Sequence, residues 1–516
     1  MTNTSRPYPA SRRRAAGSHA ACALAALVLL PLSSCSDSST AGGAAALELA
    51  STRLCALVPA RDPAAAAFPP SPPVKVFGTD LGWTYQLPDG RVPILFGDTW
   101  QRIDVCPLYP NDDAMGELHL PASDWPGFAA STSIPDAECL DISYEIDEAG
   151  TSFAPITLTR WDGVAVPLGP LNTPIGAFHD GLREWAVFIV AGGQLCTEAE
   201  AASGAACPSE LSAQAADLRC AVVDGQPRCV DPTSSRGNAS AQAYYVHFAE
   251  RMGGSAYASR AMFLTNKYLN LAVRPVRAFA PDDARASDYR VGSGSLLMWG
   301  RPGFDDLAGD GDLAPYFMHH PLPFEIVGDR IAFAPRFLTG FDDGRPLYGT
   351  SQADAVPLYT GELEPVNQVA VSWIEPIGRW LMIYSGSTTD YADPERRTGR
   401  GQPVPGAMYA RSARDPWGPW SEPEPVLTNE QAAQDMVCGH QAPEGCLAQP
   451  DPLIRPACIE AVDPRAGGNL YGANIIDPLT RPSADAAGGD AADVFWIYST
   501  WHPYSVVLVR TRVAVD

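Results

Sequence analysis

From Val74 onward, apolar and polar residues follow the short-range pattern of strands, with no long apolar stripe at helical spacing. Runs rich in β-branched, aromatic and aliphatic residues are bounded by clusters of Gly, Pro and Asp, which is typical of strands separated by turns. These runs fall into five modules of three or four candidate strands each, over residues 74–120, 173–190, 293–318, 369–411 and 470–513.

A module of this size corresponds to one blade of a β-propeller. An open sheet of about twenty strands would leave edges that curl or aggregate, whereas radial closure removes them. The pattern therefore predicts an all-β fold, a five-bladed β-propeller over residues 73–516; a pair of sandwiches is the structural alternative. Two cysteine-rich segments interrupt the pattern, and we interpret them as disulfide-pinned loop insertions at about 193–240 and 428–467.

The first module contains a predicted hairpin whose loop is Leu87–Arg91, with the sequence LPDGR. Proline presets the first φ of such a loop, and glycine takes the left-handed position of the accompanying bulge. Counting outward from Leu87 opposite Arg91 places Asp80 opposite Asp98. Directly opposed residues in an antiparallel pair have Cβ atoms about 4.5–5.5 Å apart.

Two carboxylates at that distance repel each other, so a purely structural sequence has little reason to place them there. The same repulsion raises one of the two pKa values and can give one acid and one base at neutral pH. The alternative is that Asp80 and Asp98 are separate turn or cap residues. A shift of one residue in register would put them on opposite faces of the sheet.

The N-terminal segment has the pattern of a bacterial lipoprotein signal. Three arginines at 12–14 precede a short apolar run from Ala20 to Leu32, and LSSC follows it at 32–35. We therefore expect residues 1–34 to be a signal peptide and residues 35–72 to be a lipidated Cys35 followed by a flexible tether. An ordinary cleaved signal is the alternative. The expected location is the outer membrane or the cell surface.

Charge and cysteine content narrow the partners. The net charge of −23 argues against nucleic acid, because phosphate binding needs basic patches. Twelve cysteines together with an export signal indicate disulfides. Setting aside Cys22 and Cys35, plausible local bridges are Cys196–Cys207, Cys220–Cys229 and Cys438–Cys446.

No metal or other cofactor is predicted. The acidic run at 305–312 does not reproduce the spacing of a twelve-residue calcium loop. The zinc-peptidase HExxH, the GxSxG elbow and the phosphate loop are all absent from the sequence.

The string GTDLG at 78–82, followed by FGDT at 96–99, resembles the opening motif of the bacterial family called domain of unknown function 4185. That family is associated with the endo-D-arabinanases of glycoside hydrolase family 183. Further similar strings follow in order at TPIG (173–176), GEL (361–363), RWLMIY (379–384), RSA with GPWS (411–421) and STWHPY with VLVR (499–510). The resemblance implies a five-bladed propeller that hydrolyses an arabinofuranose polymer. The two cysteine-rich insertions depart from the family's pattern and put the substrate in doubt.

Together, the hairpin and the resemblance make Asp80 and Asp98 the candidate catalytic pair. Carboxyl groups about 5–5.5 Å apart suit a retaining glycosidase, and about 6.5–9.5 Å suits an inverting one. Direct opposition favours the shorter spacing, so we expect a retaining mechanism with Asp80 as nucleophile and Asp98 as general acid/base. The two roles are also compatible with the reverse assignment.

Six further residues are candidates for substrate binding. Tryptophans beside the pair can stack on sugar faces, a histidine or arginine at a blade end can bind hydroxyl groups, and a third carboxylate can modulate the pair. Interblade packing, structural hydrogen bonds or a solvated turn are the alternatives for each. These candidates are Trp83, Trp100, His179, Arg301, Glu362 and His502.

The sequence thus predicts an exported, lipid-anchored, monomeric glycoside hydrolase that cleaves an arabinofuranose polymer internally. Its expected partners are the polysaccharide and, through Cys35, the membrane. One alternative is a non-catalytic carbohydrate-binding propeller. Another is a glycosidase acting on a different furanoside or on a plant-type arabinan.

Overall fold

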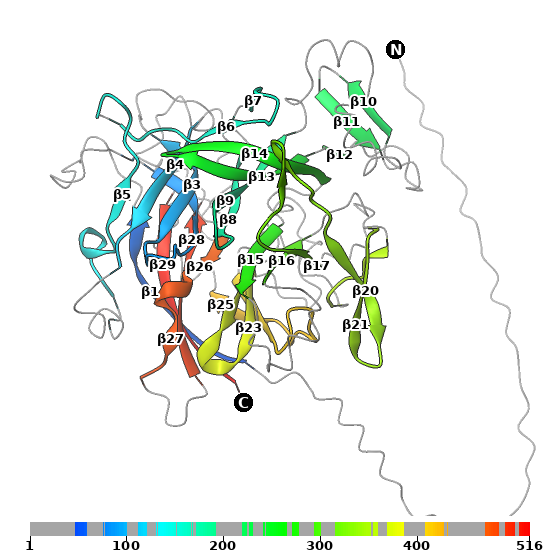
Figure 1. Ribbon diagram of the computed structural model, residues 1–516. Coiled ribbons are helices and arrows are strands. Elements are labelled where there is room, and N and C mark those ends of the chain that lie inside the picture. Colours follow the sequence, from blue (N-terminus) through cyan, green and yellow to red (C-terminus); the bar gives the residue numbers. More distant parts are fainter. Residues whose placement is uncertain are drawn as a thin grey trace, which may run out of the picture. The chain divides into compact units, whose positions relative to one another are not determined.

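Strands, most of them paired antiparallel, build the described part of the chain (Figure 1). The computed structural model describes residues 47–58, 76, 78–100, 112–120, 131, 133–150, 152–166, 168, 172–191, 219–223, 226–230, 241–242, 244–265, 271–277, 294–300, 315–351, 354–359, 369–385, 408–427, 431, 470–484, 491–500 and 505–515. All of these residues belong to one compact unit, Ala44–Asp516. Among them, no helix has both the length and the apolar character needed to span a membrane.

Blades I and II are built from the first half of the chain. Blade I has the strand order β2 (Gly78–Thr84), β3 (Pro93–Trp100), β4 (Asp112–Leu118) and β5 (Ile142–Tyr144). Blade II has the order β8 (Thr173–His179), β9 (Glu184–Ala191), β13 (Tyr244–Gly253), β14 (Ala256–Thr265), β6 (Thr157–Thr159) and β7 (Ala165–Val166).

Blades III to V follow. Blade III is β15 (Leu271–Arg277), β16 (Gly294–Gly300), β17 (Tyr316–Pro321), β20 (Arg336–Asp342) and β21 (Arg345–Gly349). Blade IV is β22 (Val369–Ile374), β23 (Arg379–Ser385), β24 (Met408–Ala413) and β25 (Glu424–Leu427). Blade V is β26 (Leu470–Ile475), β28 (Ala491–Thr500), β29 (Ser505–Val515) and β1 (Leu47–Val58), with β27 (Arg481–Pro482) also paired to β28.

Smaller elements complete the description. One three-stranded sheet is β10 (Arg219–Val223), β11 (Gln226–Val230) and β12 (Ala241–Gln242), and one hairpin is β18 (Ile326–Val327) with β19 (Arg330–Ile331). Within the described ranges, the 3-10 helices include η1 (Asp136–Glu138), η4 (Glu375–Ile377) and η6 (Asp477–Leu479).

The five blades close into a ring. The innermost strands are β2, β8, β15, β22 and β26, and each contacts the next, with β26 returning to β2. The buried apolar side chains form one cluster at each of the five blade interfaces: I with II, II with III, III with IV, IV with V, and V with I. The predicted five-bladed propeller is confirmed.

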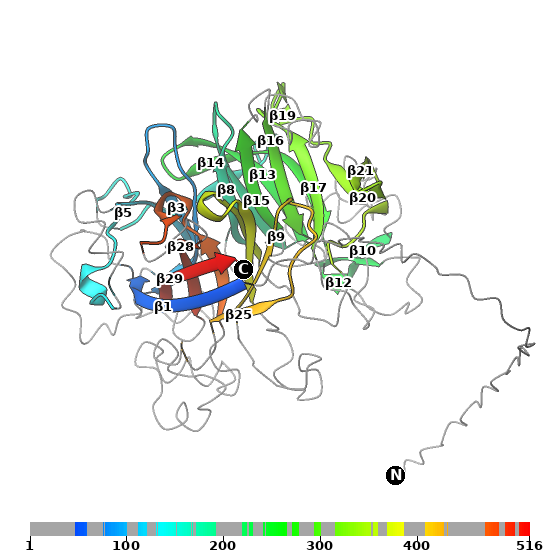
Figure 2. The ribbon, with the colours of Figure 1, turned by 90° about the horizontal axis from the view of Figure 1, so that it is seen from below.

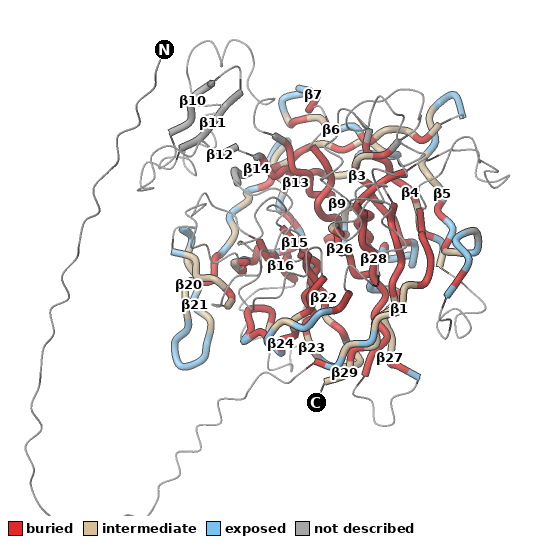
Figure 3. Tube along the Cα trace, turned by 180° about the vertical axis from the view of Figure 1, so that it is seen from behind, coloured by how far each residue is buried: buried red, intermediate tan, exposed pale blue. Residues whose placement is uncertain are grey.

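The strand pattern explains this packing. Along β3, Leu95 packs toward blade II, whereas its neighbours Ile94 and Phe96 pack toward blade V. Successive side chains of a strand point to opposite faces, so a strand covered on both faces is apolar throughout. Figure 3 shows the result, with buried strands such as β26 and β28 and exposed turns at the blade ends.

The N-terminal strand closes the ring, and this corrects the predicted tether. Residues 47–58, placed in a flexible linker by the sequence analysis, form β1 as the outermost strand of blade V (Figure 2). Leu47 pairs with Val515, so the two ends of the described chain lie side by side. This strand was not predicted because the segment is rich in Ala and Ser and because its partner, β29, lies at the other end of the sequence.

A disulfide and two hydrogen bonds also tie β1 to blade I. Cys55 is bonded to Cys139, the Ala56 N–H donates to Asp136 Oδ1 at 2.7 Å, and the Ile134 N–H donates to the Leu54 carbonyl at 2.9 Å. This disulfide was not among the predicted bridges. Cys220 and Cys229 are opposite each other on β10 and β11, which leaves their bridge a prediction; the other two predicted bridges lie outside the described residues.

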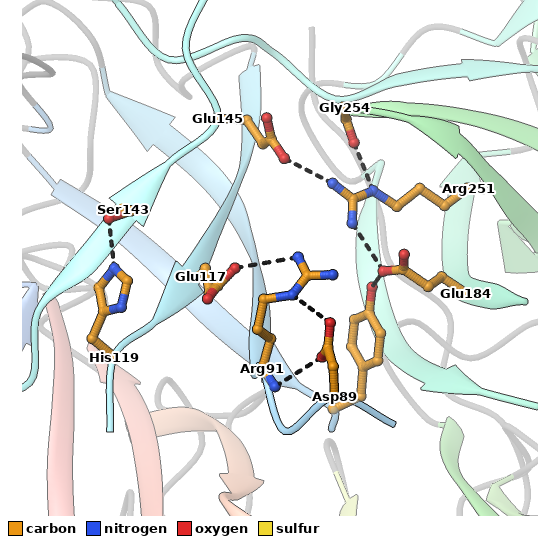
Figure 4. Close-up of polar contacts among 10 residues, drawn as sticks. Asp89, Arg91, Glu117, His119, Ser143, Glu145, Glu184, Arg251 and Gly254 are labelled. Carbon is orange, nitrogen blue, oxygen red and sulfur yellow. Dashed lines mark hydrogen bonds and ion pairs between the residues drawn. The ribbon is translucent and has the colours of Figure 1, made fainter. Parts of the chain in front are cut away.

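A group of hydrogen-bonded polar side chains joins blades I and II near the carboxyl end of β2 (Figure 4). Arg251 on β13 donates to Glu184 at 2.9 Å and to Glu145 at 2.7 Å, and the Tyr85 hydroxyl donates to Glu184 at 2.6 Å. Arg251 is largely buried, with 12% of its side chain exposed. These charged hydrogen bonds therefore hold the two blades together where little solvent competes.

Candidate functional site

The predicted hairpin forms, but the predicted opposition of Asp80 and Asp98 is wrong. The loop closes as expected, with the Leu87 N–H donating to the Arg91 carbonyl at 2.9 Å and Gly90 at a φ of 91°. Asp80 nevertheless pairs with Gly97.

Two compensating irregularities cause this shift. The expected register holds at two places, where Trp83 pairs with Leu95 and Gly78 pairs with Trp100. Between them the pairing is shifted by one residue, with one irregularity after Gly78 and the other before Trp83. Leu81 and Gly82 adopt positive φ values of 65° and 95°, which locally re-aims the strand.

Contacts with blade V fix the shifted backbone. The Leu81 N–H donates to Ser499 Oγ at 2.6 Å, and Ser499 lies on β28. A Cβ on Gly82 would lie 2.5 Å from Ile497 Cδ1, so only glycine fits there. These partners are more than 400 residues away in the sequence, which is why hairpin geometry alone could not reveal the shift.

The two acids still interact electrostatically. Asp80 is almost fully buried, with 6% of its surface exposed, whereas Asp98 is half-buried. Burial raises the pKa of the Asp80 carboxyl well above its usual value, and the nearby charge of Asp98 raises it further. One acid is thus biased toward the protonated form beside a more exposed carboxyl group.

Glycine at position 97 makes room for Asp80. A Cβ on Gly97 would lie 2.5 Å from Asp80 Oδ1 and would also collide with Thr173 Oγ1. Thr173 begins β8 in blade II, so blade II contributes a hydroxyl group beside the acid. Within the described part of the chain, neither Asp80 Oδ1 nor Thr173 Oγ1 has a hydrogen-bond partner.

The other oxygen of Asp80 is held by blade V. The Tyr471 hydroxyl, at the start of β26, donates to Asp80 Oδ2 at 2.7 Å. Asp80, Thr173 and Tyr471 therefore gather near the amino-terminal ends of three neighbouring inner strands. Asp80 was predicted from the sequence, whereas Thr173 and Tyr471 were not.

Toward the carboxyl-terminal ends of the inner strands, the propeller axis is narrow, and polar side chains interact across it. Asn474 Oδ1 accepts from the Thr84 hydroxyl at 2.9 Å, and Arg274 pairs with Asp477 at 3.1 Å. A small cavity on the axis is lined by residues of all five inner strands, and about 10 Å³ is open to the centre of a water molecule. That is close to the least that one water needs, so this part of the axis is no polymer site.

The remaining predicted site residues are dispersed. Trp83 is buried and lines the axial cavity. His179 lies at the other end of β8 from Thr173, and its Nδ1 accepts from the Gly181 N–H at 3.0 Å. Trp100 ends β3, and nothing is described of its side chain. Cys35, Arg301, Glu362 and His502 lie outside the described residues.

No metal site is apparent in the described ranges, which contain no group of three or more His, Cys, Asp or Glu side chains able to hold an ion. The arrangement at Asp80 is a pair of carboxyl groups with hydroxyl neighbours. Such an arrangement can carry out proton transfer and nucleophilic attack by a carboxylate.

Neither known protein families nor curated proteins give a match to the sequence. Among solved structures, a putative hydrolase from Bacteroides ovatus is similar with a TM-score of 0.36 and 10% identity, covering 85% of this chain and 86% of that one. An exo-beta-1,3-galactanase from Phanerochaete chrysosporium has a TM-score of 0.36 and 8% identity, covering 90% and 63%. A protein of unknown function from Dyadobacter fermentans has a TM-score of 0.32 and 7% identity, covering 91% and 99%. We draw no functional conclusion from similarities this distant.

Proposed function

We propose that the protein is a glycoside hydrolase whose catalytic carboxyl groups are Asp80 and Asp98. The observation that supports this most directly is the raised pKa of a buried carboxyl beside a second, half-buried one. Pairs of acids with pKa values pushed apart are characteristic of glycosidase sites. The proposed substrate is an arabinofuranose polymer, cleaved internally, as the resemblance in sequence implies.

The environments favour the reverse of the roles preferred from the sequence. Burial keeps the proton on Asp80, which suits a general acid, while the more exposed Asp98 suits the ionised nucleophile. In the first step Asp80 gives its proton, directly or through one water, to the glycosidic oxygen, and Asp98 bonds to the anomeric carbon as that oxygen leaves. In the second step water attacks the anomeric carbon, returns a proton to Asp80 and releases Asp98.

Substitution of each acid tests this proposal. We expect Asp80→Asn and Asp98→Asn each to lower the hydrolysis rate of arabinan or of mycobacterial arabinogalactan by at least about a thousandfold, because each removes one half of the acid–nucleophile pair. Asp180→Asn is the matched control. Asp180 is also buried, and asparagine retains the Oδ1 that accepts from the backbone N–H groups of Leu182 and Arg183. Its Oδ2 accepts from Trp185 Nε1 at 2.8 Å, so this variant should lose stability but keep its activity.

The roles separate on an aryl oligoarabinofuranoside with a good leaving group. Such a substrate needs little acid assistance, so Asp80→Ala should retain the first step, and added azide should give a glycosyl azide of retained configuration. Asp98→Gly with azide should give the inverted azide, because azide replaces the nucleophile. Wild-type hydrolysis with inversion would exclude the retaining mechanism.

A non-catalytic carbohydrate-binding propeller is the competing proposal. It is supported if wild type binds arabinan but releases no reducing ends, and if both Asn variants bind as wild type does. Hydrolysis of plant arabinan but not of mycobacterial arabinogalactan would instead change the substrate and leave the catalytic pair in place.

We also propose that the protein is an exported lipoprotein anchored through Cys35, on the basis of the N-terminal sequence pattern alone. In a bacterial host that processes lipoproteins, labelled palmitate should enter the wild-type protein. Cys35→Ala should abolish this labelling and leave the protein in the soluble fraction. Equal labelling of both would contradict the anchor.

A further inference from the structure

Tyr471 connects the last blade of the propeller to the first. It lies on β26, and its hydroxyl donates to Asp80 Oδ2 on β2 at 2.7 Å, although the two residues are 391 positions apart in the sequence. Tyr471 is half-buried and Asp80 is buried, so the hydrogen bond lies at the edge of the solvent-accessible region.

Backbone irregularities on both strands bring the two side chains together. Gly472, the residue after Tyr471, has a φ of 66°, and a Cβ there would lie 3.2 Å from Leu81 Cδ2 and 3.4 Å from Leu81 Cα. Leu81, the residue after Asp80, also has a positive φ, of 65°. Non-glycine residues rarely adopt this conformation, so the structure holds both strands in an unusual path where Tyr471 meets Asp80.

The hydrogen bond makes the two oxygens of Asp80 different. Oδ2 accepts from Tyr471, whereas Oδ1 is buried close to Gly97 and Thr173 Oγ1 and has no hydrogen-bond partner among the described residues. Because a protonated carboxyl donates from one oxygen only, a tyrosine that donates to Oδ2 favours the proton on Oδ1. The proton then lies on the buried oxygen, beside the Thr173 hydroxyl.

We propose that Tyr471 is a positioning residue for Asp80: by donating to Oδ2 it fixes the orientation of the carboxyl group that transfers the proton to the substrate. This inference rests on the proposed glycosidase function. Tyr471 forms no bond with the substrate in this scheme and acts only through Asp80.

The groups that face Asp80 define how its titration should change. Among the described residues, Asp98 on β3 and Tyr471 on β26 are the titratable groups that act on it. The neighbouring strands β8 and β28 contribute the neutral hydroxyls of Thr173 and Ser499. Burial and Asp98 raise the pKa of Asp80, and the Tyr471 hydrogen bond lowers it by stabilising the carboxylate.

Tyr471→Phe tests the proposal, and Tyr85→Phe is its matched control. Tyr85 also donates to a carboxylate, Glu184 Oε2 at 2.6 Å, but lies beyond the carboxyl end of β2. In the pH profile of kcat/KM, the alkaline limb reports loss of the proton from the general acid. We expect Tyr471→Phe to move that limb to higher pH and to lower kcat about tenfold with little change in KM, because the acid is less well placed. Tyr85→Phe should move neither.

A second measurement needs no activity. Asp80 binds its proton more tightly in the folded state, so its contribution to stability is complete below the unfolded pKa and is lost as pH rises through the folded pKa. Tyr471→Phe raises the folded pKa further, so the loss of Tm with rising pH should extend to higher pH than in wild type. When Asp80→Asn is introduced into both wild type and Tyr471→Phe, the difference in the pH dependence of Tm between them should disappear.

These readouts separate the two proposals. A wild-type protein that hydrolyses no arabinan contradicts the function, whereas the pH dependence of Tm still tests the link between Tyr471 and Asp80. An unshifted alkaline limb together with an unchanged pH dependence of Tm in Tyr471→Phe would overturn the positioning role, whatever the change in kcat.

Discussion

At the scale of single residues, the site depends on the absence of a side chain at Gly97 as much as on the acids themselves. Asp80 was identified from the sequence because two acids flank one hairpin, and its electrostatic link to Asp98 is present. Tyr471 was not identified, because nothing in a local pattern shows that the fifth module begins beside the first. The role of Gly97 was not predicted either: its lack of a side chain is what admits the carboxyl group.

The first residue-scale prediction concerns this glycine. Gly97→Ala places a methyl group 2.5 Å from Asp80 Oδ1, so the carboxyl group must move. Overpacking of this kind costs about 1–3 kcal/mol in unfolding free energy, and displacement of the acid should lower kcat about a hundredfold. Thermal melts and initial rates measure the two effects.

The control for that substitution is Gly181→Ala. Gly181 has a φ of 101° and no atom within 4 Å of an added Cβ, so alanine strains the backbone without touching the site. We expect a loss of about 1 kcal/mol and unchanged kcat. If Gly97→Ala were as active as Gly181→Ala, the placement of Asp80 over Gly97 would be irrelevant to the reaction.

At the scale of elements, the sequence predicted those features of secondary structure that neighbouring residues alone determine. The hairpin loop at 87–91 formed because proline and glycine supply its φ values without help from the rest of the chain. The bulges in β2 were not predictable, since Ser499 and Ile497 impose them from blade V. β1 was missed for a related reason: its twelve residues have no partner near them in the sequence.

The disulfide at β1 gives an element-scale prediction. Cys55 and Cys139 are separated by 84 residues, and the chain-entropy relation gives a contribution of about 4.6 kcal/mol for a loop of that size. Cys139→Ser should therefore lower Tm clearly, and dithiothreitol should lower the Tm of wild type by more than that of the variant.

The double variant Cys55→Ser/Cys139→Ser is the control for that experiment. It should melt with the single variant, because one bond is lost in both. Equal Tm values for wild type and Cys139→Ser would show that strand pairing with β29 and the hydrogen bonds to Leu54 and Ala56 hold β1 without the cross-link.

At the scale of the whole molecule, the number of blades was predictable because each module is a small sheet with two apolar faces, and each face must be covered by a neighbouring module. One apolar cluster at each of the five interfaces satisfies that need. The size of blade II was not predictable from the modules, since β13 and β14 lie beyond the cysteine-rich insertion and pair back to β9. Ring closure also explains the site: Asp80 and Tyr471 come from the first and last blades and meet only when the ring is complete.

The pairing of Leu47 with Val515 has a consequence for how the chain can be cut and rejoined. A linker of a few residues between these positions would convert β29 and β1 into an ordinary hairpin. New chain ends could then be opened at the exposed Asp89–Gly90 turn, where an added side chain meets no neighbour. Such a circular permutant would synthesise the fifth blade as one continuous piece, and the pairing between the first and last strands made would move to blade I, where β2 pairs with β3.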